Sequence, residues 1–277
     1  MPRTSGSPTR SNDLARQIVV AASAVLALAG SFIGSGAAGG TEIKDASNGA
    51  LAADATLIAP GGPAFAIWSV IYLGLVAYAV WQFLPAQRTA ARHRSLGYPA
   101  AASLLLNAAW ILSIQFDLLW LSVPIIVALL AVLAWIFVLL RRSEPLGVLD
   151  AVVTDGTMGL YLGWVCVATA ANVAAVLVAA GFGGFGIDPN AWAGAVLLVA
   201  AAVGVALALY GQGRLAPSLS LCWGLAWVAA ARLGGDLHST PAAVTALVGV
   251  VAVLAVTAAA RLRPMLAATP PTQRNAP

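Results

Sequence analysis

The sequence predicts an all-α integral membrane protein, on three observations. Of the 277 residues, 61% are hydrophobic and only 9% are charged, a composition that no water-soluble domain of this size needs. The apolar residues form runs long enough to cross a bilayer as helices. The charged residues fall between these runs, because ions are costly to place in hydrocarbon. We therefore expect a multi-pass protein of the cell membrane, surrounded by lipid.

Eight apolar runs are expected to be membrane helices. Arg10 and Arg16 precede the first run, so this run could also be a cleaved signal peptide, but it is longer than the apolar region of most signal peptides. The seventh run is short and could be tilted or re-entrant. The expected runs cover residues 18–36, 63–83, 98–114, 118–140, 149–180, 192–210, 217–231 and 241–260.

The connections divide the chain into four parts. Residues 1–17 are rich in Ser, Thr, Pro and Arg and are expected to be a disordered cytoplasmic tail. A Gly- and Phe-rich loop at 181–189 separates a five-helix part from a three-helix part, and a Pro-rich tail closes the chain. The parts after the first tail are residues 18–180, 190–262 and 263–277.

Charge alternates from one connection to the next. Arginines occur in the N-terminal tail, in a basic loop at 88–94, at 141–142, at 214 and after residue 260, and the connections between these are acidic or nearly neutral. Because cytoplasmic loops of membrane proteins carry an excess of Lys and Arg, this alternation places both termini in the cytoplasm. It also supports eight spans, since a missed span would break it.

The charge and the cysteines exclude several classes of function. The net charge of +4 reports orientation, because no basic patch with interleaved aromatics suggests a nucleic-acid partner. Cys166 and Cys222 both lie in apolar runs, where cysteines behave as small hydrophobes. We predict no disulfide, metal or cofactor, and we find no catalytic triad or phosphate-binding loop, so no catalytic residues and no enzyme are expected.

One stretch of the fifth run carries aromatic and polar side chains. In residues 161–172, YLGWVCVATAAN, helical spacing places Tyr161, Trp164 and Asn172 on one stripe, with Thr169 on its flank. Such residues also occur at membrane interfaces and as hydrogen bonds between helices. Because Trp164 lies in the middle of the run, we favour a ligand pocket.

Two further runs carry similar faces, and one acid lies inside the fifth run. Phe65, Trp68 and Tyr72 share a face of the second run, and Asn107 and Trp110 share a face of the third. Asp155 lies inside the fifth run, and an acid within the membrane is a candidate functional residue. Arg232 is the candidate counter-charge of Asp155. We favour the simpler interpretation, in which Asp155 lies at the cytoplasmic end of its helix.

Three segments resemble the TspO/translocator-protein family, also called tryptophan-rich sensory proteins or peripheral-type benzodiazepine receptors. Residues 63–72, PAFAIWSVIY, resemble the family's entry to its second helix; residues 106–110, LNAAW, resemble a signature of the third; and residues 161–172 resemble the Tyr-x-x-Trp-x-x-Phe-Ala-Thr-x-x-Asn pattern of the fifth. The resemblance covers about residues 18–180, so the last three runs lie outside it.

The resemblance implies a five-helix bundle with an aromatic pocket closed by the first long loop, and homodimers. Its ligands would be porphyrins and related tetrapyrroles, or sterols and other hydrophobic aromatics. The implied ligand-binding residues are Phe65, Trp68, Tyr72, Asn107, Trp110, Tyr161, Trp164, Thr169 and Asn172.

These observations favour a membrane receptor or sensor for a small hydrophobic ligand, which it could also transport. The alternative is a proton-coupled secondary transporter or permease for a small solute, with Asp155 as the coupling residue. An enzyme acting on a lipid or pigment ranks last, because no nucleophile or metal site is visible.

Overall fold

The computed structural model describes residues 8–34, 36, 41–43 and 45–267, and in this part of the chain all regular structure is helical. Seven of these helices are long and apolar enough to cross a membrane, which confirms the predicted all-α membrane fold. The elements are α1 Pro8–Gly34, α2 Ala46–Gly49, η1 Gly62–Ala66, α3 Ile67–Trp81, α4 Pro85–Arg88, α5 Ala91–Gln115, α6 Leu119–Arg141, α7 Val148–Asp150, η2 Ala151–Gly156, α8 Thr157–Ala179, η3 Gly184–Gly186, α9 Pro189–Tyr210, α10 Leu215–Gly234 and α11 Thr240–Ala267.

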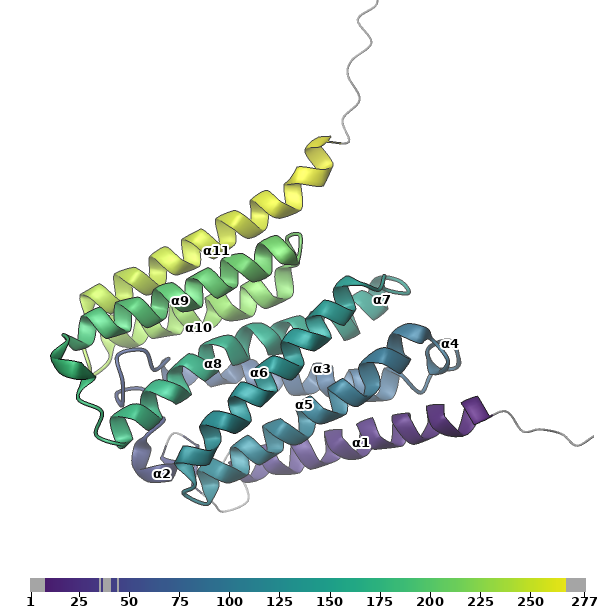
Figure 1. The fold of residues 1–277 in the computed structure, drawn as a ribbon, viewed down its shortest axis with the longest axis horizontal. Helices are drawn as coiled ribbons and strands as arrows, with labels where there is room; N and C mark the ends of the chain where they lie inside the picture. Colours follow the sequence, from purple (N-terminus) through teal and green to yellow (C-terminus); the bar gives the residue numbers. More distant parts are fainter. Residues whose placement is uncertain (1–7, 35, 37–40, 44, 268–277) are drawn as a thin grey trace, which may run out of the picture.

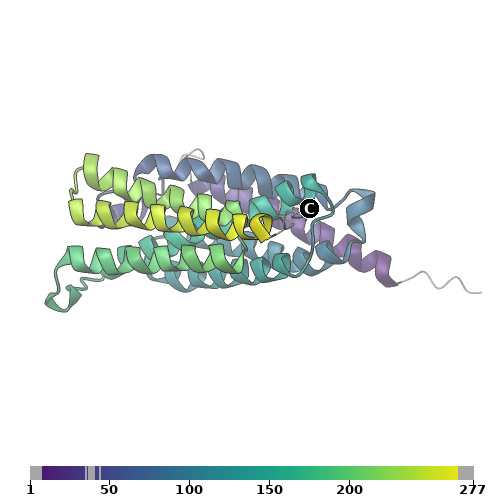
Figure 2. The same ribbon diagram turned by 90° about the horizontal axis from the view of Figure 1, so that it is seen from above.

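The seventh expected span, at 217–231, is not among these seven helices; it corresponds to α10, a regular helix of 20 residues. At 1.5 Å per residue, a helix of this length spans about 30 Å, the thickness of the hydrocarbon core. It extends past the expected run at 217–231, because Arg232, directly after that run, is buried within the helix. The long helices lie side by side along the molecule (Figure 1 and Figure 2).

Five helices form a closed ring. Contacts link α1 to α5, α5 to α6, α6 to α8, α8 to α3 and α3 back to α1. The interior of the ring holds large buried side chains from several of these helices, among them Tyr78, Leu104, Leu129 and Trp164. The long apolar runs thus bury one face against each other and present the other face to lipid.

The last three long helices pack against one another and join the ring through α10 and α8. Because α9 returns the chain between them, α8 and α10 run in the same direction (Figure 1). Glycines on α8 allow the two backbones to come close: a Cβ added at Gly163 would lie 2.1 Å from the Pro217 carbonyl oxygen. Small residues at such a contact are typical of membrane helix pairs.

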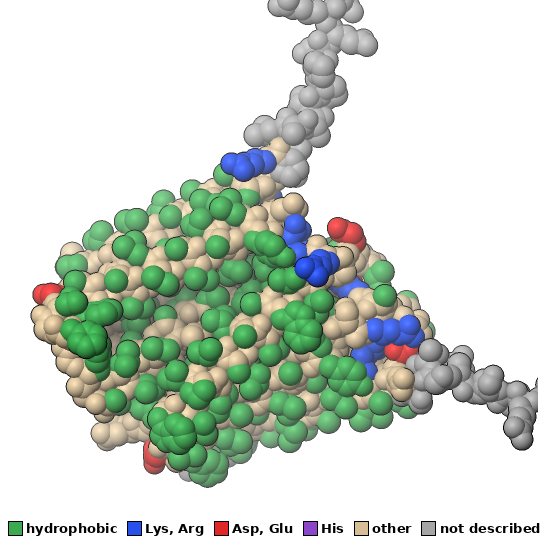
Figure 3. Space-filling model, viewed as in Figure 1, with side chains coloured by type: hydrophobic (Ala, Val, Ile, Leu, Met, Phe, Trp, Pro, Cys, Tyr) green, Lys and Arg blue, Asp and Glu red, His purple; other side chains and the backbone are tan. Residues whose placement is uncertain are grey.

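Most arginines of the described part of the chain lie at one end of the molecule (Figure 3). There Arg94 pairs with Asp13 at 2.6 Å, and Arg16 donates to the Arg88 carbonyl oxygen at 2.9 Å. The expected disordered tail at 1–17 is therefore wrong from Pro8 onward, since α1 begins there and Asp13 and Arg16 are buried. Residues 1–7 lie outside the described part of the chain.

The basic loop expected at 88–94 is also wrong. Arg92 and His93 lie in the first turn of α5 and are buried. The composition of this segment suggested a solvated loop because the acids that pair with it, Asp150 and Asp155, lie far away in the sequence. At the other end of the chain, α11 continues to Ala267, past the expected boundary at 262, and residues 268–277 lie outside the described part.

Candidate functional site

Aromatic side chains from three segments meet inside the ring. Trp68 on α3 stacks on Tyr72 with ring centroids 5.4 Å apart, and it meets Trp164 on α8 edge to face at 6.2 Å. Phe65, in the short η1 helix before α3, meets Trp164 at 5.7 Å. Edge-to-face and offset pairs are the favourable geometries for aromatic rings. The helical spacing seen in the sequence therefore brings these rings into one cluster.

Polar side chains beside this cluster bond mostly to one another. Asn107 on α5 donates to the Tyr72 hydroxyl at 2.6 Å. The Trp110 indole donates to the Asn172 Oδ1 at 3.1 Å. Buried polar groups need such partners, because an unpaired donor or acceptor in an apolar interior is costly. These contacts tie α3, α5 and α8 together.

Two further predicted residues use their hydroxyl groups on backbone carbonyl oxygens, although the Tyr161 ring also meets Trp68 edge to face at 5.9 Å. Tyr161 is fully buried and donates to the Ser103 carbonyl oxygen of α5 at 3.2 Å. Thr169 donates to the Val165 carbonyl oxygen of its own helix at 2.7 Å. Such a bond to the preceding turn is common for Thr in helices, so the hydroxyl of Thr169 is used locally.

Ser122 on α6 was not predicted from the sequence. It is buried, and the Asn172 amide donates to its hydroxyl at 2.9 Å. A serine in an apolar run is common in membrane helices, and only the positions of its partners distinguish this one. No signal in the sequence alone could have selected it.

A small cavity of about 40 Å³ lies between these helices. Its walls come from α3, α5, α6 and α8, and its roof comes from residues of the connection after α1, which we call the lid segment, residues 45–61. Tyr72, Tyr161 and Thr169 do not line it. The predicted residues that do are Phe65, Trp68, Asn107, Trp110, Trp164 and Asn172.

Three polar atoms around this cavity have no hydrogen-bond partner among the described residues. They are the indole nitrogen of Trp164, Oδ1 of Asn107 and the hydroxyl of Thr56 in the lid segment. All three are buried and come from different elements. A bound molecule with its own donor and acceptor would satisfy them, and so would one or more waters, since about 10–15 Å³ accommodates each water.

The lid segment is held at both ends. Ser47 donates to the Ile114 carbonyl oxygen at the end of α5, at 2.9 Å. At the other end the Gly61 amide donates to the Trp227 carbonyl oxygen of α10, at 3.2 Å. The roof of the cavity therefore bridges the ring and the three-helix group.

The proposed pair of Asp155 and Arg232 is wrong. Because α8 and α10 run in the same direction, Asp155 before α8 and Arg232 in the last turn of α10 lie at opposite ends of the molecule. Arg232 instead donates to the carbonyl oxygens of Ala53 and Thr56 in the lid segment. The actual partners of Arg232 are backbone carbonyl oxygens, which every residue has, so the residue types could not predict them.

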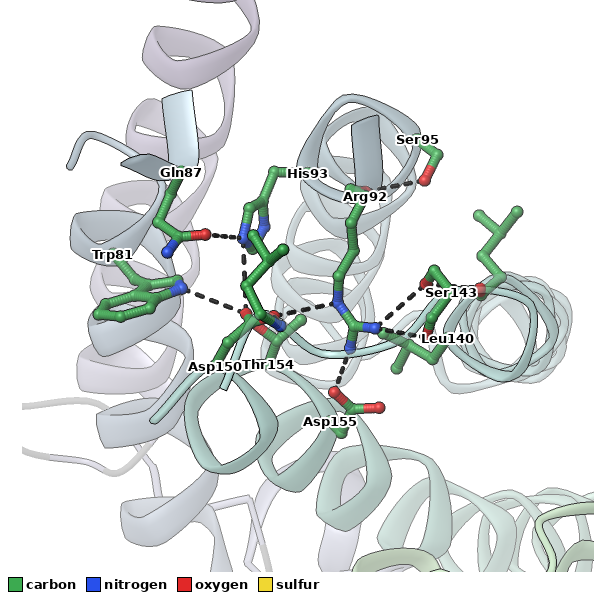
Figure 4. Close-up of polar contacts among 12 residues, drawn as sticks. Trp81, Gln87, Arg92, His93, Ser95, Leu140, Ser143, Asp150, Thr154 and Asp155 are labelled. Atoms are coloured by element: carbon green, nitrogen blue, oxygen red, sulfur yellow. Dashed lines mark hydrogen bonds and ion pairs between the residues drawn. The ribbon is translucent and has the colours of Figure 1, made fainter. Parts of the chain in front are cut away.

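Asp155 belongs to an ionic cluster at the arginine-rich end. One of its oxygens accepts from Arg92 on α5, and the other accepts from Arg214, directly before α10. Asp150 lies beside it, 3.3 Å from Nε of Arg92 and 3.5 Å from Nε2 of the buried His93. Figure 4 shows Arg92 between the two acids. The simpler interpretation of Asp155, as an acid at a helix end, agrees with this position.

A π-helical turn, η2, brings the two acids to the same side. In an α-helix, residues five apart point about 140° away from each other. The wider turn of η2, Ala151–Gly156, closes i to i+5 hydrogen bonds, so residues five apart lie almost above one another. Asp150 and Asp155 can therefore both face Arg92.

The described residues contain no group of three or more His, Cys, Asp and Glu side chains arranged to hold a metal ion. Cys166 and Cys222 are both free and buried. The cavity itself presents aromatic faces and a few hydrogen-bonding atoms.

A family model described as TSPO-like protein matches residues 17–260. No curated protein and no solved structure matches the chain. The match starts within α1 and ends within α11, so it includes the three helices that the sequence resemblance, limited to about residues 18–180, left outside. The match and the helical membrane fold agree with the resemblance in the second, third and fifth spans. The chain therefore belongs to the TSPO-like protein family.

Proposed function

We propose that this protein is a membrane receptor for a flat, hydrophobic aromatic ligand of the porphyrin type, which it binds without chemical change. The observation that supports this best is the lidded cavity, where aromatic walls surround unpartnered polar atoms. Indole and phenyl faces offer a large stacking surface. The indole of Trp164 and the amide of Asn107 would fix the orientation of the ligand through hydrogen bonds.

The size of the cavity defines what binding requires. A volume of about 40 Å³ holds a few waters, whereas sites for drug-sized ligands measure about 300–1,000 Å³. The ligand-bound state must therefore be more open than this one. The lid segment is the part of the wall that lies outside the long helices, so its displacement is the simplest way to create the space.

Titration of the purified protein in detergent with protoporphyrin tests the proposal. Binding is followed by quenching of tryptophan fluorescence and by the change in porphyrin absorbance. We expect saturable binding that Trp164→Phe weakens about 5- to 10-fold, because an aromatic ring, though a smaller one, is kept and one hydrogen bond of about 1 kcal/mol is lost. An excess of a sterol in competition tests the other ligand class.

Trp135→Phe is the matched control, because the Trp135 side chain is 56% exposed on α6 and does not line the cavity. It should bind like the wild type. Absence of saturable binding to the wild type, or an equal loss in both variants, would contradict the proposal.

The transporter alternative receives less support. A proton-coupling acid is expected along a path near the middle of the membrane. Asp155 lies at the arginine-rich end, accepts from two arginines and does not line the cavity. Its position therefore agrees better with a role in joining helices.

We further propose that the arginine-rich end faces the cytoplasm. Arg94 pairs with Asp13 near the start of α1, and Arg261 near the end of α11 donates to the Gly213 carbonyl oxygen. Both ends of the described chain thus lie at the basic end, and the positive-inside rule assigns that end to the cytoplasm. Homodimers, which the family resemblance implies, stay a prediction.

A further inference from the structure

Arg232 is a buried cation whose partners lie in the roof of the cavity. Its side chain is 1% exposed. Nη1 donates to the Thr56 carbonyl oxygen at 3.0 Å, and Nη2 donates to the carbonyl oxygen of Ala53. Asp54, between these two residues, adds an electrostatic attraction. Because a buried guanidinium is costly without partners, its two bonds fix the position of this stretch of chain.

The same helix also holds the segment that follows. The Trp227 carbonyl oxygen accepts from the Gly61 amide at 3.2 Å, and the Trp223 indole donates to the Ala64 carbonyl oxygen at 2.9 Å. A Cβ added at Gly61 would lie 3.3 Å from the Trp227 ring, so the chain passes close to the helix there. From its middle to its last turn, α10 therefore holds the stretch from Ala53 to Ala64.

The stretch between these attachments supplies most of the lid residues that cover the cavity, and Ala50 and Leu51 before it supply the others. Thr56, Ala59 and Pro60 all line it, and the hydroxyl of Thr56 is one of the three unpartnered polar atoms. Arg232 does not line the cavity itself. It acts on the cavity through the backbone of the residues that do.

We propose that α10 is a latch for the lid segment, and that Arg232 is the positioning residue that holds this segment closed and sets the rate at which a ligand exchanges. The second half of this inference depends on the proposed function. The first half concerns only the ligand-free protein. The three helices that follow the five-helix ring thereby act on the ligand site, because one of them holds the cover of that site.

Hydrogen–deuterium exchange of the ligand-free protein tests the latch directly. Arg232→Met keeps the length and the apolar stem of the side chain and removes every donor. We expect exchange of the amides in residues 50–61 to become about 10-fold faster, because two hydrogen bonds from a charged group are lost. The amides of α5 and α8 should exchange as in the wild type. Arg232→Lys, which keeps a donor, should give an intermediate rate.

Arg142→Met is the matched control, because Arg142 is exposed at the other end of the molecule, and it should leave the lid amides unchanged. Trp223→Phe is a second, milder variant. It removes the indole donor to the Ala64 carbonyl oxygen and shortens the ring that packs on Trp227, and it should accelerate exchange at the end of the lid segment. Unchanged lid exchange in both Arg232→Met and Trp223→Phe would overturn the latch. Faster exchange throughout the ring would also overturn it, since it would show a general structural role.

The link to the ligand is measured by stopped-flow dissociation of bound protoporphyrin. Arg232→Met should release protoporphyrin about 10-fold faster than the wild type, and Arg142→Met should release it at the wild-type rate. Faster lid exchange with unchanged release would overturn the control of ligand exchange. If the wild type does not bind protoporphyrin, the proposed function fails, and the exchange experiment still decides whether α10 holds the lid segment.

Discussion

Asn172 shows that a polar side chain beside the cavity can have both its oxygen and its nitrogen hydrogen-bonded to neighbouring side chains. Its Oδ1 accepts from the Trp110 indole, and its amide nitrogen donates to Ser122. Trp164 lies on the same helix and is equally buried, yet its indole nitrogen has no partner among the described residues. Among the residues that the family pattern selects, some therefore have every polar atom paired within the protein, whereas Trp164 and Asn107 each keep one atom without a partner among the described residues.

Asp155 gives a prediction about stability at this scale. Asp155→Asn removes the negative charge shared by Arg92 and Arg214 and leaves two cations close together at the end of the ring. Breaking a largely buried ion pair costs about 3 kcal/mol. We expect a clear decrease in the thermal unfolding temperature of the purified protein.

Glu144→Gln serves as the comparison for Asp155→Asn, because it removes an acid at a nearby but exposed position. It should unfold close to the wild-type temperature. If Asp155→Asn unfolds at the same temperature as Glu144→Gln, the ionic cluster does not stabilise the fold.

At the scale of elements, the contact between α8 and α10 joins the ring to the last three helices. Gly159 and Gly163 face the start of α10, where a Cβ would lie within 3 Å of Pro217 atoms. Further along, a Cβ at Gly224 of α10 would lie 2.9 Å from Val167. The backbones of α8 and α10 thus approach closely both near Pro217 and near Gly224, and the glycines at these positions permit the close approach.

Gly163→Ala should therefore push α8 and α10 apart. Its new methyl group would meet the backbone of Pro217, which cannot rotate away, and overpacking of this kind costs about 1–3 kcal/mol. We expect lower stability in thermal unfolding and faster hydrogen exchange along α10.

Gly194→Ala is the paired substitution, since it makes the same change in the second turn of α9, where nothing lies within 4 Å of the new Cβ. It should leave stability unchanged or raise it by up to about 1 kcal/mol, because alanine favours a helix over glycine. Equal effects of the two substitutions would show that the close contact is not important for stability.

For the whole molecule, the arginine-rich end predicts the orientation in the membrane. Phe185, 84% exposed in the connection between α8 and α9, should face the outside, and the exposed Arg142 should face the cytoplasm. The two native cysteines are buried, so introduced cysteines can be read separately. A membrane-impermeant maleimide should label Phe185→Cys in intact cells and Arg142→Cys only after permeabilisation. The reverse pattern would invert the proposed orientation.

The sequence predicted the helices and the aromatic cluster because both depend on local spacing. Trp68 and Trp164 were selected from patterns within single runs, and the structure brings them together. The partners of Arg92 and Arg232 could not be predicted in this way. One pairs with acids more than fifty residues away, and the other bonds to backbone carbonyls that every residue carries.

The helix ends were harder to predict than the helix centres for a related reason. Buried charge at Asp13, Arg16 and His93 reads as loop or tail when hydropathy is the only guide. In the folded protein these side chains neutralise or hydrogen-bond one another across α1, α4 and α5. Hydropathy therefore predicted the apolar centre of each helix but missed the polar turns at the helix ends.

The position of α8 has one more consequence. Trp164 lines the cavity, and its neighbour Gly163 contacts α10, so a single helix separates the proposed ligand site from the helix that contacts the lid segment. By thermodynamic reciprocity, whatever effect a bound ligand has on the attachment of the lid segment to α10, that attachment has the same effect, to the same degree, on the affinity for the ligand. Ligand binding in the cavity would in this way change the contact between α10 and the lid segment without moving any of the membrane-spanning helices.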